Sequence, residues 1–109
     1  MIVFYTEQVM EKDIEYAQTE FNNNASKFFF SLYARFHDAV KLLNRRRDDN
    51  VFQQLRGKYL YTLKKQLEDM AKTCLDKYKS SKDISHLKET LSYSVDRYMN
   101  EFSQKAASL

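Results

Sequence analysis

Apolar side chains recur every three or four residues from position 10 to position 43, which is the spacing of one face of an α-helix. The average interval is about 3.7 residues, close to the period of a straight helix. The pattern continues through Asn22–Asn24, although Asn is a poor helix former and a common turn residue. It predicts one helix over about 6–46 with Thr6 as its N-cap, or a break at the Asn run as the alternative. The predicted stripe comprises Met10, Ile14, Ala17, Phe21, Ala25, Phe28, Leu32, Phe36, Ala39 and Leu43.

Two further stripes predict helices over about 50–79 and 83–107. The polar residues at 48–50 can cap the first of these helices, and Asp83 can cap the second. Gly57 lies inside the 50–79 helix, where it is either simply tolerated or lets another backbone approach closely. The stripes comprise Phe52, Leu55, Tyr59, Leu63, Leu67, Met70, Cys74 and Tyr78, and then Ile84, Leu87, Leu91, Val95, Tyr98, Phe102 and Leu109.

Connections of only a few residues make consecutive helices antiparallel neighbours, so the sequence predicts an all-α, up-down antiparallel bundle. It has three long helices, or four if the chain turns back at Asn22–Asn24. One Gly and no Pro argue against a sheet, because tight turns between strands draw on these residues. We expect a single domain over residues 1–109 and a helix content above about 75%. The residues expected to meet in the core are Leu32, Phe36, Leu63, Leu67, Leu91, Val95 and Tyr98.

Composition narrows the class of protein further. No window approaches the roughly 18 apolar residues of a membrane span, and the apolar start Met1–Tyr5 is too short for a signal-peptide core. The single Cys excludes a disulfide framework. We therefore expect a cytoplasmic domain that uses no cofactor.

An excess of aromatic residues in the first helix is the most unusual feature of the sequence. Three adjacent rings at 28–30 span roughly 200° of a helix, whereas a surface helix has an apolar stripe only somewhat wider than 100°. One interpretation is a helix held between two neighbours with one partly exposed Phe. The other is an apolar face kept for another chain. The candidate partner-binding residues are Phe28, Phe29, Phe30 and Tyr33, and an unbroken first helix would also leave Phe4, Tyr5, Val9 and Met10 overhanging the bundle.

Charge is unevenly distributed along the chain. Five acidic residues and one Lys give residues 1–26 a net charge of −4, whereas six basic residues and one Asp give residues 27–47 a net charge of +5. The basic residues suggest an alternative function in nucleic-acid binding. The alternative is that these charges stabilise the fold. The arginines at 45–47 would lie at a helix C-terminus, where the helix dipole favours cations, and two Asp residues follow them. Lysines late in the second helix can face the acidic start of the first. The candidate anion-binding residues are Arg45, Arg46 and Arg47, with Arg56 and Lys58 nearby; the late lysines are Lys72, Lys77, Lys79 and Lys82.

Candidate catalytic and metal-binding residues are few. Asp83 and His86 share one helical face, but a di-metal bundle needs two such pairs and further inward-facing acids. Cys74 lies on an apolar stripe, where Cys is usually a small buried residue. The sequence has no Gly-rich phosphate loop, no paired-Cys motif and no nucleophile elbow. We therefore expect neither enzymatic activity nor a metal site.

The leading functional hypothesis is a protein–protein interaction module, an adaptor, assembly factor or regulator. It is expected to self-associate through its first helix, because two-fold dimers are the commonest oligomers and the two ends of this helix carry opposite charge. In an antiparallel pair, residues 7–20 of one copy would lie near residues 35–47 of the other. Another helical protein is the alternative partner.

Overall fold

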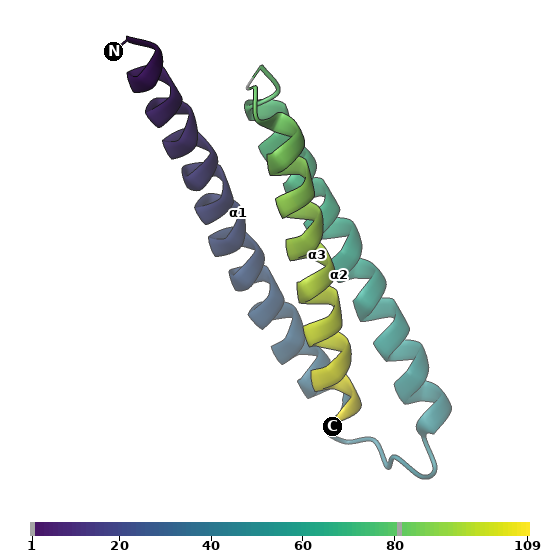
Figure 1. Cartoon of the computed structure of the whole chain (residues 1–109). Coiled ribbons are helices and arrows are strands. Elements are labelled where there is room, and N and C mark those ends of the chain that lie inside the picture. Colours follow the sequence, from purple (N-terminus) through teal and green to yellow (C-terminus); the bar gives the residue numbers. More distant parts are fainter. Residues whose placement is uncertain (1, 81) are drawn as a thin grey trace.

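The computed structural model describes the backbone of residues 2–80 and 82–109, and side chains from Ile14 onward except at position 81. Three helices account for 84% of the chain: α1 (Ile2–Val40), α2 (Asp49–Lys77) and α3 (Ile84–Ala107). Each helix packs against the other two, and no strand occurs among the described residues. α1 and α3 run in the same direction with α2 antiparallel to both (Figure 1), so the predicted three-helix, up-down bundle is confirmed. The bundle is long and narrow, about 68 × 17 × 16 Å.

α1 is continuous through Asn22–Asn24, which excludes the four-helix alternative. Phe21 and Ala25 flank this run and are both buried against the other helices. The hydroxyl of Tyr98 on α3 donates a hydrogen bond to the backbone carbonyl of Asn22 at 3.3 Å. Packing on both sides of the Asn run therefore outweighs its weak helix propensity.

The predicted boundaries of α1 are wrong at both ends. The helix starts at Ile2, so Thr6 lies inside it and is not the N-cap. It ends at Val40 instead of residue 46, because Asn44 organises the connection that follows. The Asn44 side-chain oxygen accepts hydrogen bonds from the N–H groups of Arg46 and Arg47 at 3.0 and 3.4 Å. Short polar side chains of this kind compete with helical hydrogen bonding.

Asp48 closes the same connection. Its carboxylate accepts a hydrogen bond from the Asn44 N–H at 3.0 Å, and its own N–H donates to the Asn44 carbonyl at 2.6 Å. Asp48 therefore occupies the N-cap position of α2 but uses its side chain for the connection, not for a capping bond. Asp83 stands at the N-cap position of α3, also without a side-chain capping bond.

The core is one continuous cluster contributed by all three helices, and all seven residues expected in it are buried. On the predicted stripe of α1, Phe28 is only half-buried and Ala39 is exposed, whereas Phe29 and Val40, which belong to a second apolar stripe of the sequence, are buried. The reason is that α1 packs against two helices at once, so its buried arc is wider than one stripe. The cluster comprises Ile14, Ala17, Phe21, Ala25, Phe29, Leu32, Phe36, Val40, Phe52, Leu63, Leu67, Leu87, Leu91, Val95, Tyr98, Phe102 and Ala106.

Gly57 is a tolerated helix-interior glycine. A Cβ added at this position would meet no atom within 4 Å outside its own helical neighbourhood. No backbone approaches it, so the close-approach interpretation is wrong.

Candidate functional site

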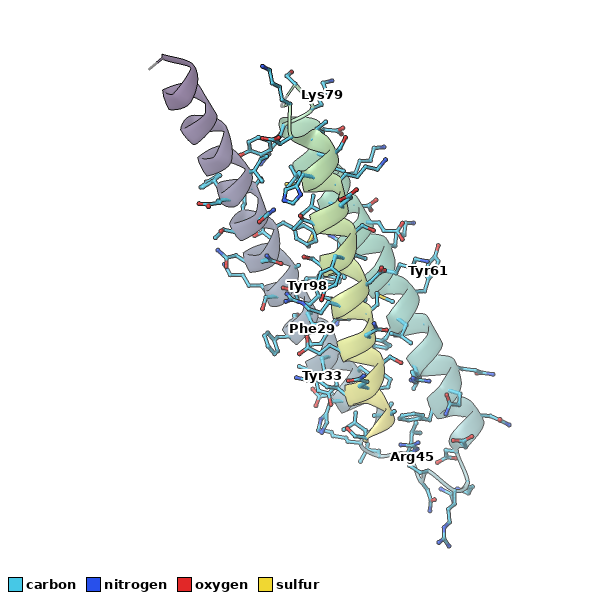
Figure 2. The ribbon with its side chains drawn as sticks, in the orientation of Figure 1. Phe29, Tyr33, Arg45, Tyr61, Lys79 and Tyr98 are labelled. Atoms are coloured by element: carbon cyan, nitrogen blue, oxygen red, sulfur yellow. The ribbon has the colours of Figure 1, made fainter. Side chains whose placement is uncertain are left out.

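The aromatic run of α1 divides between the core and the surface. Phe29 is buried, with its ring centroid 5.7 Å from that of Phe102 and 5.8 Å from that of Tyr98 on α3. Tyr33 packs edge-on against Phe102 at 5.8 Å and is half-buried. Figure 2 shows Phe29, Tyr33 and Tyr98 where α1 and α3 lie side by side. Only Phe30 is mostly exposed, at 59%. The bundle itself thus uses three of the four candidate partner-binding residues, since Phe28 also packs against the core.

A lysine of α3 lies over the same aromatic residues. The ammonium nitrogen of Lys105 is 5.6 Å from the ring centroid of Phe30 and 5.7 Å from those of Phe29 and Tyr33. These distances are within the range of cation–π attraction. The ring of Phe30 is therefore exposed to solvent on one side and contacts the Lys105 ammonium on the other.

A groove runs between α1 and α3 beside Phe30. It has a volume of about 510 Å³ and is open to solvent. The guanidinium of Arg97 lies 5.4 Å from the ring centroid of Tyr98 in its wall. The wall combines one exposed ring, two buried rings and charged groups of both signs, Arg97 and Glu101. The lining residues are Ser26, Phe29, Phe30, Arg97, Tyr98, Asn100, Glu101 and Gln104.

Several of the basic residues considered for nucleic-acid binding are engaged in contacts within the bundle. The arginines at 45–47 lie in the connection after α1 and not at its C-terminal turn, so the helix-dipole explanation for them is wrong. Arg45 places its guanidinium 3.8 Å from the centroid of the Phe52 ring. Arg47 lies 3.7 Å from the carboxylate of Asp48. The Arg56 guanidinium donates to the Ser103 hydroxyl at 2.5 Å, which ties α2 to α3. These contacts give structural roles to several of the predicted anion-binding residues.

Cys74 lies in a second groove, of about 190 Å³, between α1 and α2. Its thiol is 3.7 Å from the backbone carbonyl of Ala17, to which it donates a weak hydrogen bond. Burial raises the pKa of the Cys74 thiol and the Glu20 carboxylate raises it further, whereas the Lys77 ammonium opposes them. The thiolate needed for nucleophilic chemistry is therefore disfavoured.

Glu20 and Lys77 cross-link the same two helices at 3.2 Å. The hydrogen bond from Lys77 to Glu20 raises the pKa of the Lys77 ammonium. This contact is the predicted pairing of the acidic first half of α1 with the lysines late in α2.

The Asp83–His86 pair lies at the exposed start of α3. Within the described part of the chain, no group of three His, Cys, Asp or Glu residues is arranged to hold a metal ion. His37, the other histidine, is 3.9 Å from the Asp38 carboxylate and exposed. The residues expected to overhang the bundle, Phe4, Tyr5, Val9 and Met10, lie outside the described side chains.

The sequence interpretation missed Tyr16, Arg97 and Lys105. Tyr16 is 65% exposed on α1 and lies two heptads before Phe30, a spacing that could have identified it. Arg97 and Lys105 carry no comparable signal, because only the packing of α3 against α1 places Lys105 beside the rings of α1 and Arg97 in the groove. Tyr61 and Tyr93, which stand off their stripes in the sequence, are 67% and 71% exposed.

None of the three helices has, in its described residues, the length and apolar character that crossing a bilayer requires. No family model, curated protein or solved structure shows significant similarity to this chain.

Proposed function

We propose that the chain is a non-enzymatic protein–protein interaction module whose contact surface is the exposed side of α1 around Phe30. The observation that carries the proposal is the position of Phe30, a ring that is 59% exposed at the edge of the α1–α3 groove. Aromatic side chains are enriched in interface cores, where they bury a large area at little cost in side-chain entropy.

The surroundings of Phe30 support this proposal. Single exposed apolar residues are ordinary on protein surfaces, so exposure alone is weak support. Phe30 differs because a groove of about 510 Å³ adjoins it and Lys105 lies against its ring. Ring and groove together offer apolar area, hydrogen-bonding groups and charge, which are the components of a protein interface.

The proposal is tested with a photoreactive phenylalanine analogue at position 30, introduced into the chain in the cells that naturally produce it. The matched control carries the analogue at Tyr61, which is 67% exposed and lies on α2 (Figure 2). We expect a cross-linked species of defined mass from position 30 and none of that mass from position 61. The absence of any adduct, or the same adducts from both positions, contradicts the proposal.

A further inference from the structure

Three exposed residues of α1 follow one another at seven-residue intervals: Tyr16, Asn23 and Phe30. Seven residues are nearly two helical turns, so these side chains lie one above another on one side of the helix. Tyr16 and Phe30 are 65% and 59% exposed, the two large hydrophobic side chains of α1 that are exposed among those described. Thr19, Lys27 and Ala34, all exposed, lie between or beside them. α1 therefore has a second, outward-facing line of residues in addition to its core stripe.

We propose that this outward line binds a second copy of the same chain, with the two α1 helices antiparallel and the two-fold axis at Asn23. This inference rests on the proposed function and names its partner. In this arrangement Tyr16 of each copy lies against Phe30 of the other, because both are seven residues from the axis. Asn23 lies against Asn23, where each amide both donates and accepts a hydrogen bond. A single polar Asn in such a seam fixes the register of the two helices.

Charge favours the antiparallel direction over the parallel one. Residues 7–20 carry five acidic groups and one Lys, so a parallel pair would place this acidic segment against itself. The antiparallel pair places it opposite residues 26–39, where the exposed Lys27, Arg35 and Asp38 give a net charge of +1. A parallel pair would also place Lys27 against Lys27. Opposite charges across a helix seam set the orientation of the partners.

The register differs from the one expected from sequence, which set residues 7–20 against 35–47. That expectation used the whole aromatic run of α1, but Phe29 is buried in its own bundle. With Phe30 as the exposed ring and Tyr16 as its counterpart, the two-fold axis moves to Asn23. Four rings in one seam are fewer than a permanent dimer uses, so the dimer is weak and depends on concentration.

The experiment is sedimentation equilibrium of the purified full chain over a wide concentration range. We expect a monomer–dimer equilibrium for the parent and for Tyr61→Glu, which alters an exposed Tyr of α2. Tyr16→Glu and Phe30→Lys each raise the dissociation constant at least tenfold, with the helical circular dichroism spectrum retained. A monomeric parent at every concentration, or equal effects of Tyr61→Glu and Phe30→Lys, overturns the inference.

Mixing the two variants tests the register. In the antiparallel pair, Tyr16→Glu of one copy faces Phe30→Lys of the other, and the second Tyr–Phe pair stays intact. An equimolar mixture is therefore expected to dimerise more tightly than either variant alone. A mixture that dimerises no more tightly, while the parent dimerises, overturns the antiparallel register.

The photoreactive analogue separates the two proposals. A purified parent that stays monomeric, together with a cellular adduct of another protein at position 30, overturns self-association and leaves the interaction module standing. A monomeric parent with no cellular adduct at position 30 overturns both.

Discussion

The two halves of the bundle are packed with different kinds of side chain. Near the α1–α2 connection the core is built from rings, with Phe36 of α1 5.7 Å from both Phe52 of α2 and Phe102 of α3. Toward the α2–α3 turn it is built mainly from small and aliphatic residues, with Ala17 and Ala25 fully buried on α1 and Phe21 between them as the exception. The ring–ring contacts of Phe29, Phe36 and Phe102 belong to the first half. The aromatic half comprises Phe29, Tyr33, Phe36, Phe52, Tyr59, Tyr98 and Phe102; the aliphatic half comprises Ile14, Ala17, Ala25, Leu67, Leu87 and Leu91.

This difference shows that the two halves of one continuous core contribute differently to helix spacing and to buried area. Large rings in edge-on and tilted contacts define the spacing of the three helices and bury much area per residue. Small residues let backbones come close but contribute less buried area each. The aromatic half is also where the proposed contact surface lies, because Phe30 follows directly after the buried Phe29. We therefore expect the aromatic half to dominate stability.

Phe102→Ala should have the largest effect on stability. The ring is fully buried and lies against Phe29, Tyr33 and Phe36 of α1. Its removal leaves a cavity that rigid neighbouring rings cannot fill, and we expect a loss of about 3–5 kcal/mol in the free energy of unfolding. Urea unfolding followed by circular dichroism measures this loss. A change below about 1 kcal/mol would mean that α3 does not dock on the aromatic half as described.

Leu67→Ala tests the aliphatic half in the same assay. Leu67 is fully buried on α2. We expect a loss of about 2–5 kcal/mol, and a smaller one than for Phe102→Ala because less surface is lost. A larger loss for Leu67→Ala than for Phe102→Ala would reverse the comparison. A loss well below 1 kcal/mol would mean that the phase of α2 is misassigned.

Gly57→Ala should stabilise the protein. The position lies inside α2, has no positive φ, and has space for a methyl group. Alanine lowers the entropy of the unfolded chain and favours the helix, so we expect a gain of about 0.5–1 kcal/mol. The midpoint of thermal unfolding provides the measurement. A destabilised Gly57→Ala variant would reveal a contact of α2 that involves this surface.

The triple variant Arg45→Ala/Arg46→Ala/Arg47→Ala should have the smallest effect. Of the three arginines, Arg45 alone packs on a ring of the aromatic half, that of Phe52. An exposed cation–π contact of this kind contributes about 0.5–1 kcal/mol to stability. Arg46→Ala alone serves as the control, with no measurable change expected. Titration of the parent with random-sequence DNA and RNA at two salt concentrations completes the test. Salt-sensitive binding that the triple variant loses would favour the nucleic-acid alternative.

The sequence by itself determined the fold class and most of the core. Apolar positions at helical spacing, with scarcely any Gly or Pro, predict long helices, and short connections make those helices antiparallel. Leu63 and Leu91 are buried because they lie at the centre of the apolar stripes of α2 and α3. A residue at the centre of a stripe faces the core however the neighbouring helices are arranged. Local signals of this strength need no knowledge of neighbouring helices.

Only the tertiary structure decided which residues the bundle uses and which it leaves exposed. Periodicity could not choose between Phe28 and Phe29, because the choice depends on where α2 and α3 lie around α1. The end of α1 depended on hydrogen bonds between Asn44 and Asp48, which compete with helix continuation only in the folded connection. Contacts between α1 and α3 separate Phe30 from the rest of the aromatic run and place Lys105 beside it. The residues that make these contacts are about 75 positions apart in the sequence. Such contacts depend on helix packing, and no single stretch of the sequence encodes them.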